Sequence, residues 1–132
     1  MVHYLDTSAL VKLVVREKHS QALYEWVAGS GALAVSSDLA RTELARAVRR
    51  AEPDLAVRAR DVLSGLILIK LTTAHFEAAG RLDPTELRSL DALHLAVALD
   101  LGDDLEAVVA YDRRLIAAAE ANGVRVLAPG LS

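Results

Sequence analysis

The stretch Val2-His3-Tyr4-Leu5-Asp6-Thr7-Ser8-Ala9-Leu10 begins a pattern that the rest of the chain repeats. Its first residues, 2–5, predict a strand that ends at Asp6, and apolar residues at helical spacing over 8–16 predict a helix directly after it. Similar short apolar runs lie at 33–36, 66–69, 107–110 and 124–127, with helices expected over 20–28, 38–50, 53–63, 73–81, 89–101 and 113–121. Near-continuous apolar strands separated by helices indicate a parallel sheet covered on both faces. We therefore expect an α/β fold, a three-layer α/β/α sandwich with about five strands.

Several residues are expected to mark the ends of helices. Asp38 is a good N-cap for the helix over 38–50, and Pro53 fits the first turn of the next one. The segment Asp83-Pro84-Thr85-Glu86 resembles a cap followed by proline at the first helical position, opening about one turn. Gly102 is expected to end the strongly apolar helix before it.

Composition limits the class of protein. The chain has 132 residues and 53% hydrophobic residues, so we expect one globular domain over 1–132. It has no cysteine, which excludes thiolate zinc sites, iron–sulfur clusters and thiol nucleophiles. The net charge of −3 argues against a protein that holds nucleic acid by bulk electrostatics, and 4% aromatic residues argue against a base-stacking platform. A nuclease whose bound metal ions supply positive charge stays admissible.

Targeting signals are not expected. The mean hydropathy is +0.28, yet charged residues interrupt each apolar stretch before the roughly 18 residues that a membrane helix needs. The N-terminus has no basic leader and too short an apolar run for a secretory signal. We therefore expect a soluble, cytoplasmic protein without a membrane segment.

Aspartates stand where predicted strands or loops meet helices. Asp6 and Asp112 follow the first and fourth predicted strands. Ligands of open parallel sheets collect beyond the carboxyl ends of strands where the strand order reverses, so these two side chains converge if their strands are neighbours. Asp91 begins a helix that is apolar on nearly every side, and an unpaired buried charge there would be costly. Capping and the helix dipole would explain any one of these aspartates without a function.

Glu43 and His94 each allow two interpretations. Glu43 lies inside a predicted helix at the border of its apolar face, with Arg46 and Arg50 at i+3 and i+7. The group is either a surface charge ladder or a carboxylate facing a crevice with arginines placed to receive phosphates. His94 could share a face with Asp91. A hydrogen-bonded structural histidine is favoured over a metal ligand, because no second histidine is spaced to complete a site.

Taken together, the acidic positions resemble a known family. The segments LDTSAL, RTELARAVRR, SLDALHLAVAL and VVAYDRRL, in this order, are similar to the PIN-domain family, and more narrowly to the VapC toxins of bacterial toxin–antitoxin pairs. The likeness spans essentially the whole chain. One departure is Ala110, where many relatives carry a small hydroxyl residue before the Tyr-Asp pair.

The resemblance implies a metal-dependent ribonuclease. Asp6 and Asp91 would be the main ligands of Mg²⁺ or Mn²⁺, Glu43 and Asp112 would complete the site, and Thr7 or Ser8 would position a ligand or a phosphate. Carboxylate oxygens without thiolates or paired histidines suit these ions better than zinc. The implied partners are an RNA substrate, a VapB-type antitoxin and a second copy of the chain. Apolar residues of the first two helices offer surface for such contacts: Leu10, Val11, Val14, Val15, Leu23, Trp26 and Val27.

Other functions stay open. An aspartyl phosphotransferase with Asp6 as nucleophile would need a second aspartate two residues on, where this chain has Ser8. A dinucleotide-binding domain would need glycines after the first strand, and none is present there. A catalytically inactive PIN-like binding module is the remaining alternative, although all four acidic side chains are present.

Overall fold

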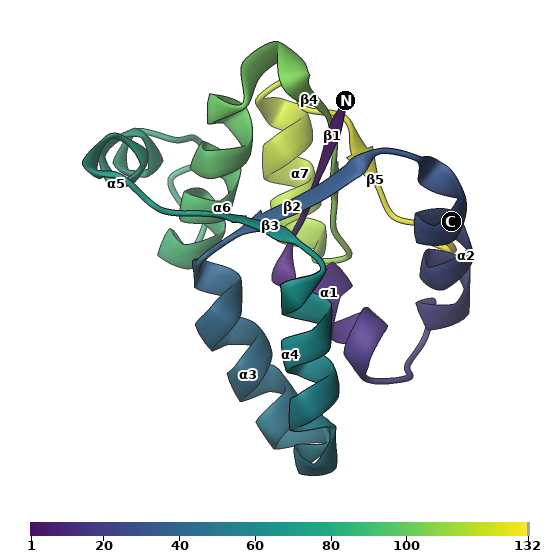
Figure 1. Cartoon of the computed structure of the whole chain (residues 1–132). Helices are drawn as coiled ribbons and strands as arrows, with labels where there is room; N and C mark the ends of the chain where they lie inside the picture. Colours follow the sequence, from purple (N-terminus) through teal and green to yellow (C-terminus); the bar gives the residue numbers. More distant parts are fainter. Residues whose placement is uncertain (132) are drawn as a thin grey trace.

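The computed structural model describes residues 1–131 and contains one parallel sheet of five strands. The strand order is β3-β2-β1-β4-β5, and each neighbouring pair runs parallel. Figure 1 shows the sheet with helices around it. The strands are β1 (Val2–Leu5), β2 (Leu33–Ser37), β3 (Ile67–Ile69), β4 (Leu105–Val109) and β5 (Val126–Leu127).

Helices connect all the strands. Each connection between strands contains at least one helix, as parallel pairing requires. The helices are α1 (Thr7–Val14), α2 (Ser20–Ser30), α3 (Leu39–Ala51), η1 (Pro53–Leu55), α4 (Ala56–Ser64), α5 (Thr73–Gly80), α6 (Ser89–Asp100), η2 (Gly102–Asp104) and α7 (Arg113–Ala121), where η denotes a 3₁₀ helix.

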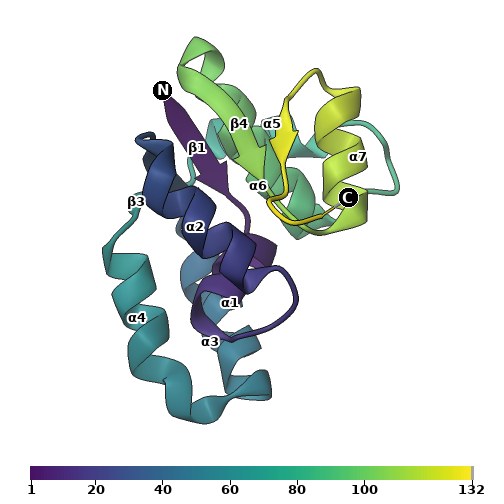
Figure 2. The same ribbon diagram turned by 90° about the vertical axis from the view of Figure 1, so that its right-hand side faces the viewer.

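The sheet separates two hydrophobic clusters. Tyr4 and Val108 are register partners on one face and pack with buried residues of α6 and α7. Leu5 and Val109, the next pair along the same strands, point to the other face and pack with α1, α2, α3 and α4. Figure 2 shows α2 in front of the sheet and α6 behind it. The predicted three-layer α/β/α sandwich is confirmed.

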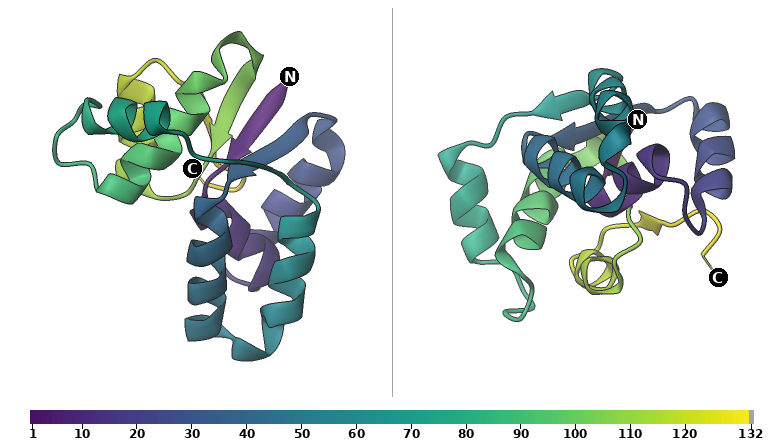
Figure 3. Two further views of the ribbon diagram at one scale, coloured as in Figure 1. Left: turned by 60° about the vertical axis from the view of Figure 1, so that its left-hand side comes forward. Right: turned by 90° about the horizontal axis from the view of Figure 1, so that it is seen from below.

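The strand order reverses between β1 and β4. These strands are neighbours, and the backbone N–H of Asp6 extends their pairing by donating to the carbonyl of Val109 at 3.0 Å. Asp6 and Asp112 therefore leave adjacent strands at the same edge of the sheet, as the sequence predicts for a binding crevice. On the β2 side of this edge, α3 and α4 lie side by side and extend away from the sheet (Figures 1 and 3).

Some predicted elements differ in detail. The helix expected over 53–63 is divided into η1 and α4, and the last strand is confined to Val126–Leu127. Asp38 precedes α3 but makes no capping hydrogen bond, because its own backbone is already helical (φ −60°, ψ −19°) and its carboxylate accepts from Arg41. After Asp83 only a single turn forms, closed by a bond from Leu87 N–H to the Pro84 carbonyl. The chain is then extended at residue 88, so no helix continues from that turn.

The apolar residues of α1 and α2 serve the core more than the surface. Leu10, Val14 and Leu23 are buried in the cluster on the α1 face of the sheet, as is Val15 just after α1. Val11, Trp26 and Val27 are half-buried. Core packing therefore explains most of the apolar residues in α1 and α2 that the sequence suggested as a surface for partner contacts. Within residues 1–131, no helix is both long and apolar enough to cross a bilayer.

Candidate active site

Asp6 is held in place by its own helix. It precedes α1 with extended backbone, and its Oδ2 accepts from the Ser8 backbone N–H at 3.1 Å and from the Ser8 hydroxyl at 2.7 Å. The Ser8 hydroxyl oxygen in turn accepts from the Tyr111 backbone N–H at 2.9 Å. The Asp6 residue is only 5% exposed. Ser8 therefore ties the Asp6 carboxylate to the loop that carries Asp112.

Asp112 and Asp91 lie at the starts of two helices. Asp112 is the N-cap of α7, and its Oδ1 accepts from the backbone N–H groups of Arg114 at 2.9 Å and Leu115 at 3.1 Å. Asp91 lies in the first turn of α6 without a capping role. Capping explains the position of Asp112, but it leaves one carboxylate oxygen without a capping bond.

Glu43 points from α3 toward the end of β1. Its Oε1 accepts from the Thr7 hydroxyl at 2.9 Å and is hydrogen-bonded to His94 Nε2. These partners belong to α1 and α6, so the carboxylate is directed inward and is not part of a surface ladder. Of the two interpretations of Glu43, the crevice is the one that the structure supports.

His94 is the buried centre of this group. It is 1% exposed, and its Nδ1 is hydrogen-bonded to the Tyr4 hydroxyl at 2.7 Å. Its Nε2 carries a proton, because the Glu43 carboxylate can only accept. The same nitrogen is 3.7 Å from Asp6 Oδ1. His94 is thus a hydrogen-bonded histidine that positions two acidic residues, which refines the structural role favoured by the sequence.

The pKa values of the group reflect mutual repulsion and burial. Desolvation, followed by the charges of Asp6 and Asp112, raises the pKa of Asp91 to about 6. Burial alone would lower the pKa of His94, but its bond to Glu43 and the nearby acidic charges raise it. Burial alone would raise the pKa of Glu43, but the bond and the charge of His94 lower it. The shift of Asp91 indicates that this carboxylate lies within electrostatic reach of Asp6, Asp112 and Glu43.

The four carboxylates share one edge of the sheet without forming a closed ligand set. Among residues 1–131, no three Asp, Glu or His side chains are gathered closely enough to hold one metal ion as they stand. Asp91 and Asp112 line a cavity of about 290 Å³, while Glu43 lines a neighbouring groove between α3 and α5. Asp6 and Glu43 are nevertheless linked through His94, whose Nε2 lies 3.7 Å from Asp6 Oδ1 and 2.5 Å from Glu43 Oε1.

The arginines at this edge differ from those the sequence suggested. Arg46 and Arg50 are exposed on α3 and do not line the cavity that contains Asp91 and Asp112. The arginines that line this cavity are Arg88, Arg113 and Arg114. Their positions, three residues before Asp91 and directly after Asp112, were the available signal. The bond between Tyr4 and His94 joins residues 90 positions apart and had no local signal.

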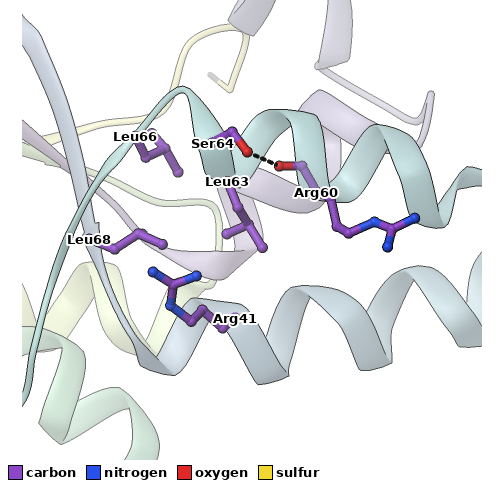
Figure 4. A pocket seen from close by; sticks show the side chains of 6 residues that line it. All are labelled: Arg41, Arg60, Leu63, Ser64, Leu66 and Leu68. Atoms are coloured by element: carbon purple, nitrogen blue, oxygen red, sulfur yellow. Dashed lines mark hydrogen bonds between the residues drawn. The ribbon is translucent and has the colours of Figure 1, made fainter.

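A larger cavity, of about 530 Å³, lies between α3, α4 and β3. Figure 4 shows its lining, in which Arg41 and Arg60 accompany three leucines and Ser64. It contains no carboxylate, so it does not offer the chemistry of the acidic edge.

The titration of Asp91 leads to a pH prediction. Its pKa rises from 3.8 to about 6 on folding, so the folded state holds this proton more tightly. In metal-free protein, the contribution of Asp91 to the free energy of unfolding is therefore complete below about pH 4, where the side chain is protonated. This contribution is lost as the pH rises through about 6 and the carboxyl group ionises. Urea unfolding in EDTA should show wild type losing stability relative to Asp91→Asn over this window. A constant difference between the two proteins would contradict the prediction. The pKa of His94 is also raised, so the stability that its protonated form contributes is likewise lost as the pH rises above 6.5.

The family follows from this fold and site together with a sequence profile. The profile of the PIN domain matches residues 3–121, which contain all four acidic positions. The chain therefore belongs to the PIN-domain family.

Individual relatives narrow the class. The chain is 40% identical over 131 residues to Ribonuclease VapC47 and 43% identical over 126 residues to Ribonuclease VapC46, both of Mycobacterium tuberculosis. Each comparison covers 96% of this chain and 96% of the relative. Ribonuclease VapC35 of the same organism is 41% identical over 130 residues. Within the PIN-domain family, the chain thus groups with the VapC proteins.

A solved structure has the same fold. The crystal structure of Mycobacterium tuberculosis VapC20, described as a Sarcin-Ricin loop cleaving toxin, superposes with a TM-score of 0.78. The superposition covers 96% of this chain and 99% of the VapC20 chain, and the two sequences are 20% identical. This similarity supports the fold and leaves the substrate of the present chain open.

Proposed function

We propose that the chain is a divalent-metal-dependent endoribonuclease that acts as the toxin of a toxin–antitoxin pair. The observation that carries the proposal is that Asp6 and Glu43 both contact His94, while Asp91 and Asp112 line one cavity, and that burial and then the acidic neighbours raise the pKa of Asp91. Relatives about 40% identical over nearly the whole chain are named ribonucleases. Hydrolysis of an RNA phosphodiester is the reaction that this site and these names support together.

The donor set fits Mg²⁺ or Mn²⁺. Two carboxylates about 4 Å apart repel by roughly 4 kcal/mol at an effective dielectric of 20, and a divalent cation would offset that repulsion. In our proposal Asp6 and Asp91 are the main ligands, and Glu43 and Asp112 complete the site. When bound, such an ion activates water and stabilises the leaving oxygen of a phosphodiester.

The surrounding residues hold the ligands. Thr7 and His94 restrain the Glu43 carboxylate, and Ser8 restrains that of Asp6. Carboxylates held by hydrogen bonds lose less conformational freedom when they bind an ion, so these contacts support both metal affinity and alignment. Thr7 and Ser8 are therefore proposed to position ligands rather than substrate.

The central experiment is RNA cleavage by purified protein. Structured and unstructured RNAs should be cut internally in Mg²⁺ or Mn²⁺ and left intact in EDTA, because the acidic edge alone repels the phosphodiester. Cleavage that is equally fast in EDTA would contradict the metal-dependent reaction. Failure to cut any RNA in either metal would contradict the proposed function.

Metal binding has a readout that does not depend on the substrate. Mn²⁺ at about 100 times its dissociation constant should stabilise wild type by about 2.7 kcal/mol, since it binds the folded state only. Thermal unfolding should therefore show a higher melting temperature for wild type but a much smaller shift for Asp6→Asn. Equal shifts in both proteins would place the ion elsewhere.

Partners are part of the same proposal. The VapC relatives support a VapB-type antitoxin as inhibitor, and we propose a homodimer as the active form. Co-expression with a VapB-type antitoxin should suppress cleavage. Light scattering coupled to size-exclusion chromatography should give a mass of two chains, and a mass of one chain would exclude the dimer.

A further inference from the structure

Three arginines surround the cavity that holds Asp91 and Asp112. Arg88 directly precedes α6, while Arg113 and Arg114 open α7. All three line the cavity of about 290 Å³ and are exposed. Two helices that lie far apart in the sequence thus bring guanidinium groups to the same small space as two carboxylates.

These arginines do not neutralise the acids beside them. Within the described part of the chain, none of the three forms an ion pair within 4 Å, although other acid–base pairs such as Arg41–Asp38 do. Arg114 reaches Asp112 through its backbone N–H, and its side chain is not used in that contact. The guanidinium groups are therefore available to an external anion.

An RNA substrate needs such groups at this edge. The protein carries a net charge of −3, and four acids gather where the reaction is proposed, so the free site repels a polyanion. Guanidinium forks bind phosphate oxygens with two parallel hydrogen bonds and stay charged at all relevant pH values. In the same cavity as Asp91 and Asp112, they counter the repulsion locally.

We infer that Arg88, Arg113 and Arg114 bind the RNA phosphates next to the bond that is cut. This inference rests on the proposed ribonuclease function and adds the residues that hold its substrate. Arg46 and Arg50, the arginines suggested by the sequence, are exposed on α3 outside this cavity, and their proposed contact with RNA phosphates is separate from this inference. Arg125 is a matched control, because it is exposed and directly precedes β5, at the end of the sheet opposite the acidic edge.

The test compares two sets of variants. Arg88→Gln, Arg113→Gln and Arg114→Gln are measured singly, alongside the single control variant Arg125→Gln. Each single variant at the cavity should raise KM for a single-stranded oligoribonucleotide about tenfold with little change in kcat, and the matching Lys variant should recover part of the loss. The control variant should leave KM within about twofold, because Arg125 lies at the other end of the sheet and salt screens its charge from RNA at the acidic edge.

Binding without turnover gives a second readout. Fluorescence anisotropy of the same oligoribonucleotide in EDTA, followed over a salt series, should show the slope of log K against log salt falling by about 0.7 for each arginine removed. The Mn²⁺-induced shift in melting temperature should persist in each variant, which separates loss of substrate contact from damage to the metal site.

The outcomes distinguish the inference from the function on which it rests. Wild-type cleavage with unchanged KM and salt slope in all three cavity variants overturns the inference and leaves the ribonuclease proposal standing. An equal or larger effect from Arg125→Gln overturns it in the same way. If wild type neither binds nor cuts RNA, the proposed function fails and this inference fails with it.

Discussion

Asp6→Asn and Asp91→Asn should each abolish metal-dependent RNA cleavage while the fold is retained. Each substitution removes a full negative charge facing the proposed cation. At 4 Å and an effective dielectric of 20, even two unit charges interact by about 4 kcal/mol, so a divalent cation should lose at least about a thousandfold in affinity. The asparagine oxygen can still accept the Ser8 bonds that Asp6 accepts, so α1 keeps its N-cap. The measurement is initial cleavage rate in Mg²⁺ and in Mn²⁺, with circular dichroism to check the fold.

Asp91→Asn carries an additional signature. Because burial and like charges raise the pKa of Asp91, its neutral replacement should leave the metal-free protein at least as stable as wild type near neutral pH. Asp103→Asn is the matched control, since Asp103 is exposed in η2 at the opposite edge of the sheet. Full activity of either site variant, or equal loss of activity in the control, would refute the assignment of these ligands.

His94→Leu should cause the largest loss of stability among single substitutions at the site. It leaves the buried Tyr4 hydroxyl and the Glu43 carboxylate without their shared partner, and such groups cost about 1–3 kcal/mol each. We expect the free energy of unfolding to fall by about 2–4 kcal/mol. Chemical unfolding in urea measures it directly.

A double-mutant cycle tests whether the loss of stability in His94→Leu comes from the hydrogen bond between Tyr4 and His94. Once His94 is leucine, the hydroxyl of Tyr4 has lost its bond to that ring, so Tyr4→Phe should then cost less than it does in wild type, by about 1 kcal/mol. Strict additivity of the two substitutions would show that the bond contributes nothing.

Mn²⁺ binding distinguishes the loss of a contact that positions Glu43 from a general loss of stability. His94→Leu should also weaken Mn²⁺ binding, because Glu43 loses a restraint. His75→Leu is the comparison: His75 is also buried, but it bonds Thr72 and Asp100, away from the acids. This variant should lose stability and keep its metal response. A metal response lost equally in both would mean that destabilisation alone explains the effect.

Local patterns in the sequence were enough for the secondary structure and for part of the site. The runs at 2–5 and 33–36 predict buried parallel strands because apolar residues are nearly continuous there, and the structure confirms the first with the same bounds and the second with one more residue at its end. Asp6 and Asp112 are recognisable as helix starts because capping involves neighbours two or three residues away. A resemblance carried by four short acidic segments named the family that the profile confirms.

Other features depend on contacts that no local pattern contains. Asp38 has the residue type of an N-cap but not the backbone angles, which the surrounding chain determines. Glu43 was ambiguous on α3 until the fold placed Thr7 and His94 against it, 36 and 51 residues away. The arginines of the cavity were likewise identified only when α6 and α7 were seen to begin beside each other.

The sequence by itself determined which segments form strands and helices and which acidic residues end the strands, because hydrophobic periodicity and capping act over a few residues. Only the tertiary structure decided that β1 and β4 are neighbours, that His94 joins Tyr4 to Glu43, and that free guanidinium groups border the acids. The physical reason is that strand order and buried hydrogen bonds are set by the packing of the whole core, whose two clusters combine residues from both ends of the chain.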